Sequence, residues 1–227
     1  MLDIEFSLYL VILGKGANEM LDRNEFDQWA GSYDETISKS SKGYPFEGYY
    51  EVLGYVQNSI EVNVNLWILD LGIGTGLLTN ELYRKGVNIV GVDFSKKMIE
   101  EAIKKMPKGI FVCYDFNENL PTEITKKKFD YIVSSYAIHH VNDERKLELI
   151  KQLSNILSNN GKIIIADIAF ENQKHLDLIK SETSAWDDDE YYIVADNLLK
   201  NFEQSGFYAR YNQISKCAGV IEIGRKV

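Results

Sequence analysis

The feature that most constrains this chain is a glycine-rich segment, Asp70-Leu71-Gly72-Ile73-Gly74-Thr75-Gly76. It follows the apolar run 66–69 and precedes Leu77 and Leu78, so the pattern predicts a strand, a tight turn and a helix. Glycines at alternate positions let the backbone turn sharply and let a ligand approach with no Cβ in the way. A dinucleotide site needs the spacing G-x-G-x-x-G, whereas the spacing here is G-x-G-x-G after an acid. The segment therefore argues against NAD and favours a cofactor with a nucleoside end and an amino-acid end.

Stretches with the periodicity of strands and helices alternate from Leu66 onward. Such alternation is typical of βαβ units and predicts an α/β fold with a doubly wound, mostly parallel sheet. The expected strands are 66–71, 88–93, 109–114, 129–134 and 162–168, followed by a hairpin of 207–212 and 220–226. The expected helices are about 76–85, one capped by Ser95, one capped by Asn142 or Asp143 and stopped by Asn159-Asn160-Gly161, and about 193–205.

Two segments outside this alternation are rich in aromatic residues, 20–64 before the first strand and 170–192 after the fifth. Open α/β sheets bind ligands at the carboxyl ends of their strands, so both segments are expected to lie near a site there. The expected organisation is a helical cap over 20–64 and a core over 65–227, which together form a single domain. Met20 opens a segment that looks like a natural start, so residues 1–19 are expected to be an N-terminal extension.

Composition and charge limit the partners. The 227 residues carry a net charge of −9 and no stripe of Lys and Arg, which weighs against a nucleic acid. The two cysteines, Cys113 and Cys217, are far apart, which fits the reducing cytoplasm. The short apolar run 8–13 follows acids instead of a basic region, and no stretch approaches the length of a membrane span. We therefore expect a cytoplasmic protein with neither a signal peptide nor a membrane partner.

Further residues suited to a nucleoside cofactor follow the later strands. Asp93 ends the second strand, where a carboxylate can accept two hydrogen bonds from ribose hydroxyls. Asp115 follows the third strand in Tyr114-Asp115-Phe116, and the segment 131–143 runs from the fourth strand through His139-His140. In the expected cap, residues 26–34 have the form F-D-x-x-A-x-x-Y-D. Each signal alone also fits a structural role, but independent signals seldom fall on successive strand ends of one sheet.

In these motifs, residues 24–227 resemble a class I S-adenosylmethionine-dependent methyltransferase of the bacterial small-molecule type. The resemblance implies a seven-stranded Rossmann-like sheet of order 3-2-1-4-5-7-6 with an antiparallel seventh strand. It also implies S-adenosylmethionine as the cofactor. The residues expected to bind it are Asp70, Gly72 and Gly74 under the methionine part, Tyr33 at the methionine end, Asp93 at the ribose, Phe94 and Met98 beside the adenine, and Asp115 with Phe116 near the adenine amino group.

The chemistry that the resemblance implies is the in-line transfer of a methyl group from a sulfonium to an O, N or S nucleophile of a small molecule. A neutral acceptor benefits from a base that removes its proton. The residue expected in that role is His140, while Asp167 and Tyr33 are candidates for holding the acceptor. No metal is expected, and neither the identity of the acceptor nor the oligomeric state is predicted.

Several alternatives stay open at this point. A non-catalytic sensor of S-adenosylmethionine or S-adenosylhomocysteine would carry the same cofactor motifs, and an NAD(P) oxidoreductase shares the acid after the second strand. A nucleic-acid methyltransferase is disfavoured, because Ser134-Ser135-Tyr136-Ala137 lacks the prolines of amino-methylating DNA enzymes and neither cysteine follows a proline. A metal-dependent catechol-type enzyme would need fixed oxygen ligands, whereas the consecutive acids 187–190 are expected to form a solvated turn.

Overall fold

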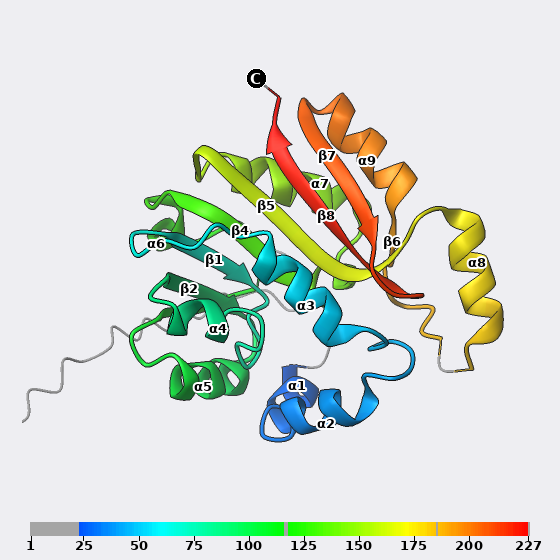
Figure 1. Ribbon diagram of the computed structural model, residues 1–227, viewed down its shortest axis with the longest axis horizontal. Coiled ribbons are helices and arrows are strands. Elements are labelled where there is room, and N and C mark those ends of the chain that lie inside the picture. Colours follow the sequence, from blue (N-terminus) through cyan, green and yellow to red (C-terminus); the bar gives the residue numbers. More distant parts are fainter. Residues whose placement is uncertain (1–22, 116–117, 185, 227) are drawn as a thin grey trace, which may run out of the picture.

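A twisted sheet, parallel through most of its strands, organises the chain and carries helices on both faces (Figure 1). The computed structural model describes residues 23–115, 118–184 and 186–226, so the expected extension 1–19 lies outside the described residues. The strands are β1 Trp67–Leu71, β2 Asn88–Asp93, β3 Ile110–Cys113, β4 Phe129–Ser135, β5 Leu157–Phe170, β6 Ile193–Val194, β7 Phe207–Gln213 and β8 Ala218–Arg225. The helices are α1 Arg23–Trp29, α2 Tyr33–Ser40, α3 Tyr49–Asn58, α4 Asn80–Arg84, α5 Lys96–Lys105, α6 Thr122–Thr125, α7 Asp143–Ser154, α8 Gln173–Glu182 and α9 Ala195–Gln204.

The strand order confirms the expected topology. The sheet runs β3-β2-β1-β4-β5-β8-β7, and the two-residue β6 pairs with the end of β5. If β6 is left out of the numbering, this is the order 3-2-1-4-5-7-6. The last strand, β8, lies antiparallel to both β5 and β7. The direction of the chain across the sheet reverses between β1 and β4, and ligands bind at such a switch point in open α/β sheets.

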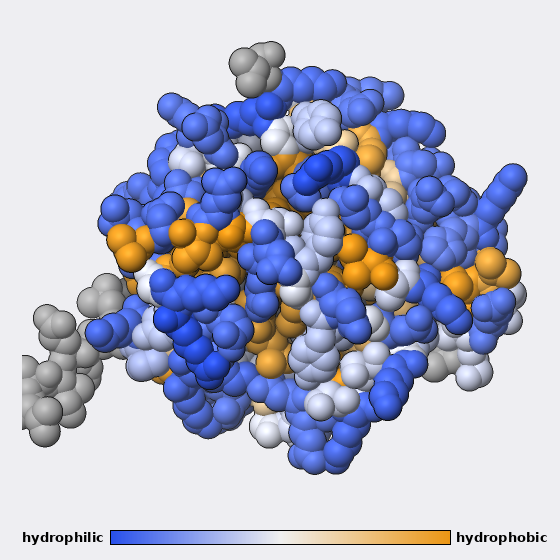
Figure 2. All heavy atoms as spheres, viewed as in Figure 1, coloured by the Kyte–Doolittle hydropathy of each residue, from blue (hydrophilic) through white to orange (hydrophobic). Residues whose placement is uncertain are grey.

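Two apolar cores form because the side chains of each strand alternate between the faces of the sheet. In β1, Ile68 belongs to the core under α3, α4 and α5, whereas the next residue, Leu69, belongs to the core under α6, α7 and α9. Figure 1 shows α3 crossing the near face of the sheet with α7 behind it. On the face drawn in Figure 2, hydrophilic side chains predominate and apolar ones gather in separate patches, as expected when the large apolar surfaces are buried against the sheet.

The helix expected over 76–85 begins later than its sequence pattern suggests. The segment from Gly72 to Thr79 forms turns, and α4 starts only at Asn80. The backbone φ angles of Gly72, Gly74 and Gly76 are 69°, 53° and 83°, which lie in the left-handed region and are incompatible with a right-handed helix. The extra loop residues widen the turn at the carboxyl end of β1.

The expected helix stop at Asn159-Asn160-Gly161 is wrong. Helix α7 ends at Ser154, and all three residues belong to β5. The pairing of β4 with β5 shifts register after Phe129, and a Cβ on Gly161 would lie 2.9 Å from the carbonyl oxygen of Phe129. This glycine therefore permits the close approach of two strands at an irregularity, which a sequence pattern does not distinguish from a helix end.

The expected caps of two helices are confirmed. The Ser95 hydroxyl accepts a hydrogen bond from the Met98 amide at the start of α5, and the Asn142 side chain accepts one from the Arg145 amide at the start of α7. Across the three described ranges, no helix has both the length and the apolar character needed to cross a membrane.

Candidate active site

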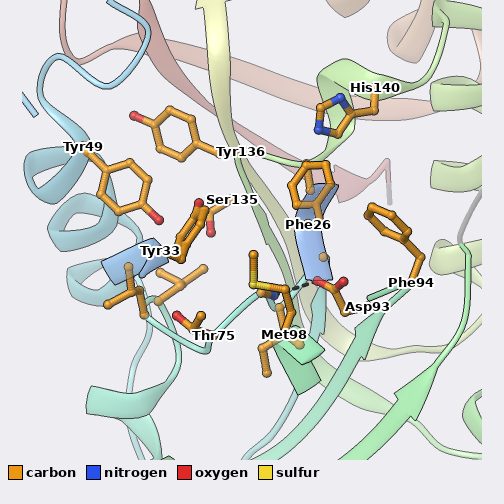
Figure 3. Close-up of a pocket in the computed structure, with 16 residues that line it drawn as sticks. Phe26, Tyr33, Tyr49, Thr75, Asp93, Phe94, Met98, Ser135, Tyr136 and His140 are labelled. Carbon is orange, nitrogen blue, oxygen red and sulfur yellow. Dashed lines mark hydrogen bonds between the residues drawn. The ribbon is translucent and has the colours of Figure 1, made fainter. Parts of the chain in front are cut away.

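A pocket lies at the carboxyl ends of β1, β2 and β4, at the switch point of the sheet. It holds about 560 Å³ of space, including solvent at its mouth, and we call it the loop pocket. Figure 3 shows Tyr33, Tyr49 and Tyr136 on one side of it and Phe94 and His140 on the other, with Asp93 and Met98 below. Its walls thus come from α1 to α3, from the glycine segment, from the end of β2 with the start of α5, and from the segment after β4.

The glycine segment forms the floor of the loop pocket. The amides of Gly72 and Ile73 both donate to the carbonyl of Val92, at 2.8 and 2.9 Å, which ties the turn to the end of β2. A Cβ on Gly74 would meet nothing within 4 Å, so this glycine leaves open space on the pocket side. A Cβ on Gly76 would lie 2.5 Å from Met106, so that glycine permits close packing against α5. The first two predicted glycines, Gly72 and Gly74, therefore line a space fit for a ligand that approaches the backbone closely.

Asp93 presents its carboxylate at the edge of this floor. It is 5% exposed, and its two oxygens accept hydrogen bonds from the amides of Gly74 and Ser95, both at 2.8 Å. Burial raises the pKa of Asp93 to about 6, against the opposing effect of these amides. A carboxylate has about four lone-pair sites, so two remain for hydroxyl donors of a ligand. Phe94 and Met98, which follow it, also line the loop pocket.

Two other predicted cofactor residues, Asp70 and Asp115, do not line the loop pocket. Asp70 is buried below the floor, where one oxygen accepts a hydrogen bond from the Thr79 hydroxyl at 2.8 Å and the other has no partner within the described ranges. Burial raises the pKa of Asp70 to about 7. Asp115 follows β3 and is not among the residues that line the loop pocket, and Phe116 lies outside the described residues. The acid of the glycine motif thus fastens the turn to the start of α4 and does not face the pocket.

The two aspartates of segment 26–34 fasten the first helices to this floor. The Ser95 hydroxyl donates to Asp27 at 2.5 Å, and the Thr75 hydroxyl donates to Asp34 at 2.5 Å. Lys105 of α5 pairs with the second oxygen of Asp34. The sequence motif singled out Tyr33, which lines the loop pocket as expected, but the roles of the flanking aspartates emerge only from these long-range contacts.

A second cavity, which we call the cap pocket, opens beside the first. It holds about 950 Å³, including open solvent, and lies between α1, the segment 44–46, the residues after β4 and the segment 187–192. Four residues line both pockets: Phe26, Tyr33, Tyr136 and His140. The arrangement can hold two ligands that meet at these four side chains.

Tyr136, at this junction, is held in an unusual conformation. Its φ of 50° lies in the left-handed region, where residues other than glycine are uncommon, and its amide donates to Ala166 in β5. Its ring stacks on Tyr49 at 4.6 Å between centroids, and its buried hydroxyl has no hydrogen-bond partner in the part of the chain that the structure describes. Backbone strain of this kind gathers at functional sites, which supports the assignment of this junction as the active site.

His139 lies deep in the cap pocket and is anchored from below by Asp167. Its Nδ1–H donates to the Asp167 carboxylate at 2.5 Å, and the other carboxylate oxygen accepts the amides of Ile138 and His139. Burial disfavours the charged imidazole, but Asp167 outweighs it and raises the pKa of His139; in turn, His139 lowers the pKa of Asp167 against the effect of burial. The proposed contact of Asp167 with an acceptor is not supported, because this carboxylate is fully buried within β5 and lines neither pocket.

His140 stands at the junction and is oriented by Glu190. A carboxylate can only accept, so the 2.9 Å contact between His140 Nδ1 and Glu190 places the proton on Nδ1 and leaves the Nε2 lone pair available. Burial and the neighbouring His139 hold the pKa of His140 below its ordinary value. The solvated turn expected over 187–190 is therefore wrong for Glu190, whose side chain is 17% exposed and paired, although Asp187 to Asp189 are exposed.

The same group could also coordinate a cation. His139, His140 and Glu190 offer ligand atoms within 4.8 Å of one another, the one such set among the residues that the structure describes. In each imidazole, however, Nδ1 already forms a hydrogen bond with a carboxylate. A histidine that is oriented by a carboxylate in this way also suits proton transfer, so the arrangement fits an acid–base site as well as a metal site.

The chain is similar to known methyltransferases in sequence and in fold. Residues 68–161 match a family described as "Methyltransferase domain". A relative named "Uncharacterized methyltransferase" from Bacillus pumilus is 33% identical over 209 residues, which cover 88% of this chain and 96% of the relative. Another from Alkaliphilus oremlandii is 37% identical over 159 residues, which cover 69% and 72%.

Solved structures share the fold at low identity. The complex of DhpI with SAH has a TM-score of 0.68 and 15% identity, covering 89% of this chain and 94% of that chain. The magnesium protoporphyrin IX methyltransferase of Synechocystis with bound SAH has a TM-score of 0.65 and 18% identity, covering 90% and 100%.

Proposed function

Because the chain belongs to the class I S-adenosylmethionine-dependent methyltransferases, we propose that it methylates an O, N or S nucleophile of a small molecule, with the cofactor in the loop pocket and the acceptor in the cap pocket. The observation that carries this proposal is the junction of the two cavities, since His140, Tyr33 and Tyr136 line both. A transferred group has to pass between two bound molecules, and this junction is where they would touch.

The loop pocket fits the cofactor by its donors and its shape. The open space at Gly74 suits the methionine part, the lone pairs of Asp93 suit the ribose hydroxyls, and Phe94 with Met98 suit the adenine ring. Tyr33 stands at the junction, where an aromatic ring near a sulfonium gives a favourable cation–π contact. Asp115 and Phe116 remain predicted contacts of the adenine. Asp70 contributes indirectly, because its hydrogen bond with Thr79 holds the glycine turn in place.

The mechanism needs little beyond positioning and one proton transfer. S-adenosylmethionine supplies a methyl group on a positively charged sulfur. The side chains at the junction exclude water and align the acceptor. His140 removes the acceptor proton at Nε2, because its lowered pKa keeps the imidazole neutral near pH 7 and Glu190 holds the ring in the tautomer required. Glu190 then stabilises the imidazolium that forms.

A small molecule suits the cap pocket, a local cavity lined largely by aromatic side chains, better than a nucleic acid does, and the net charge of −9 agrees. The cytoplasm, expected from the cysteine usage, remains the proposed location.

The proposal is tested in two steps that separate it from a non-catalytic sensor. Titration calorimetry with S-adenosylhomocysteine measures whether the cofactor binds, and we expect a single site per chain. Release of S-adenosylhomocysteine is then measured with panels of amines, thiols, phenols and carboxylates. Binding without turnover on every class would favour the sensor, and absence of binding would contradict the cofactor site itself.

A further inference from the structure

The walls of the cap pocket combine aromatic rings with carboxylates. Half of the described residues that line it are Phe, Tyr or Trp, and Glu25, Asp187 and Glu190 line it as well. No Lys or Arg is among the described residues that line it. This composition is unusual beside a surface on which lysines and acids mix, as in the exposed pairs of α5.

The charge of these walls is negative. His139 adds no net positive charge, because its partner Asp167 lies directly beneath it. His140 is held neutral by burial and by His139, which lower its pKa. The carboxylates of Glu25, Asp187 and Glu190 are thus not balanced by a cationic side chain within the lining. A cavity with low-dielectric walls focuses such a field, so it attracts cations and repels anions.

The aromatic rings add a second attraction for cations. Trp29 packs edge-on against Tyr33, with 4.6 Å between centroids. On the other side, Tyr44 and Tyr192 line the pocket. Trp186 lies behind them, outside the lining, at 5.5 Å and 4.7 Å between ring centroids, and its own ring already faces Lys180. The faces of Trp and Tyr attract ammonium groups, and their bodies bury apolar surface.

From this pairing of rings with unbalanced carboxylates, we infer that the acceptor is an amine, bound as its ammonium on an apolar body and methylated on nitrogen. The inference rests on the methyl transfer proposed above and selects nitrogen among the three nucleophiles. A carboxylate or thiolate acceptor would enter against the field, whereas an ammonium is drawn in by it.

The reaction balances with the groups at hand. His140 Nε2 takes one proton from the ammonium, which leaves a lone pair on nitrogen. That pair forms the new N–C bond while the S–C bond breaks and its electrons stay on sulfur, so the positive charge passes to the nitrogen. Glu190 holds the protonated imidazole until the proton leaves to solvent. Glu190 is a positioning residue, because it acts through the ring of His140.

The test compares probes that share one skeleton. Phenethylamine and phenethyltrimethylammonium are titrated against the wild-type protein saturated with S-adenosylhomocysteine, beside 3-phenylpropionate, 2-phenylethanol and 2-phenylethanethiol, with tryptophan fluorescence as the readout. We expect both cations to bind at least tenfold tighter than the carboxylate. In a separate assay with S-adenosylmethionine in place of S-adenosylhomocysteine, we expect the amine to be methylated and S-adenosylhomocysteine to be released. Equal or tighter binding of the carboxylate, or turnover of the thiol and not the amine, would overturn the inference.

Charge variants localise the effect to the pocket. The double variant Glu25→Gln, Asp187→Asn should weaken binding of phenethyltrimethylammonium by about threefold to tenfold at low salt, because each exposed carboxylate contributes only a modest attraction to a cation. The matched control Asp188→Asn, Asp189→Asn removes the same charge from neighbouring exposed positions that do not line the pocket, and should leave binding nearly unchanged. Equal effects of the two doubles would also count against the inference.

These outcomes are separate from those of the proposed function. Titration with S-adenosylhomocysteine in the absence of an acceptor tests binding at the loop pocket, so its failure contradicts the cofactor assignment of that pocket. If the cofactor binds and the cations do not, the amine inference fails and the transfer to another nucleophile stands.

Discussion

The loop pocket and the cap pocket share four side chains, yet they are built in opposite ways. The floor of the loop pocket is one continuous segment, whose glycines shape the backbone next to the end of β1. The cap pocket depends on side chains from four segments, brought together over long stretches of sequence, such as the 50 positions between His140 and Glu190. Backbone shape persists when side chains vary, whereas a wall of side chains changes with each substitution. We therefore expect the floor of the proposed cofactor site to tolerate side-chain substitutions better than the walls of the proposed acceptor site do.

The largest expected effect breaks the loop pocket alone. Asp93→Ala removes the two lone-pair sites proposed for the ribose, and hydrogen bonds to charged groups contribute about 1.5–3 kcal/mol each, so affinity for S-adenosylhomocysteine should fall about 10³-fold. Calorimetry measures the loss, with thermal unfolding as a check on folding. Asp196→Ala, at an exposed acid in the first turn of α9 that does not line the loop pocket, serves as the control and should have a much smaller effect. Wild-type affinity in Asp93→Ala would remove Asp93 from the cofactor site.

The next effect separates chemistry from binding. His140→Ala should lower kcat about 10²-fold or more, the usual contribution of a general base, while affinity for S-adenosylhomocysteine changes little. Single-turnover kinetics with the identified acceptor measures this split. An unchanged kcat would show that the acceptor needs no base at this junction.

The third effect is a pH dependence of the loop pocket. Asp93 must be ionised to accept hydroxyl donors, and burial raises its pKa to about 6. Cofactor affinity should therefore be constant above that pH and fall as the pH drops through it, by about tenfold at pH 5, since each pH unit below the pKa removes about nine-tenths of the ionised form. Calorimetry from pH 5 to 8 checks it, and Asp93→Asn should abolish the dependence. A flat wild-type profile would place the pKa of Asp93 at its ordinary value.

The smallest effect sharpens the cap pocket. Glu190→Gln should lower kcat about tenfold, because oriented partners of a functional histidine contribute about that much. Glu190 raises the pKa of His140, so its removal should shift the acidic limb of the kcat profile to lower pH.

Treatment with EDTA should leave wild-type kcat unchanged if these groups carry out proton transfer and do not bind a metal. Loss of activity with EDTA, restored by a divalent cation, would instead assign His139, His140 and Glu190 to a metal.

The fold was accessible to sequence analysis because its signals are local. The alternation of apolar runs predicted the mostly parallel sheet, the family resemblance implied its strand order, and single residues predicted the caps at Ser95 and Asn142. The sequence analysis was wrong where one residue type suits two different local structures. Gly161 suits a helix end and a strand irregularity equally, and only its contact with Phe129 separates them.

The candidate site was predicted unevenly for the same reason. Gly74, Asp93 and Phe94 lie at strand ends or within three residues of one, so their place at the loop pocket could be anticipated. Glu190 could not be, because a run of acids looks solvated unless the histidine that it meets is known. Asp70 and Asp167 look available to ligands at strand positions, yet both are buried among protein partners.

The contacts of Asp27 and Asp34 make the two pockets one energetic unit. These carboxylates bind the start of α5 and the glycine turn, while the helices that carry them supply Phe26 and Tyr33 to both cavities. A molecule that settles these helices against the turn improves the site for the other molecule, and linkage requires the improvement to be equal in both directions. Replacing the first two helices to admit a new acceptor should therefore change the affinity for the cofactor, unless the replacement keeps Asp27 and Asp34.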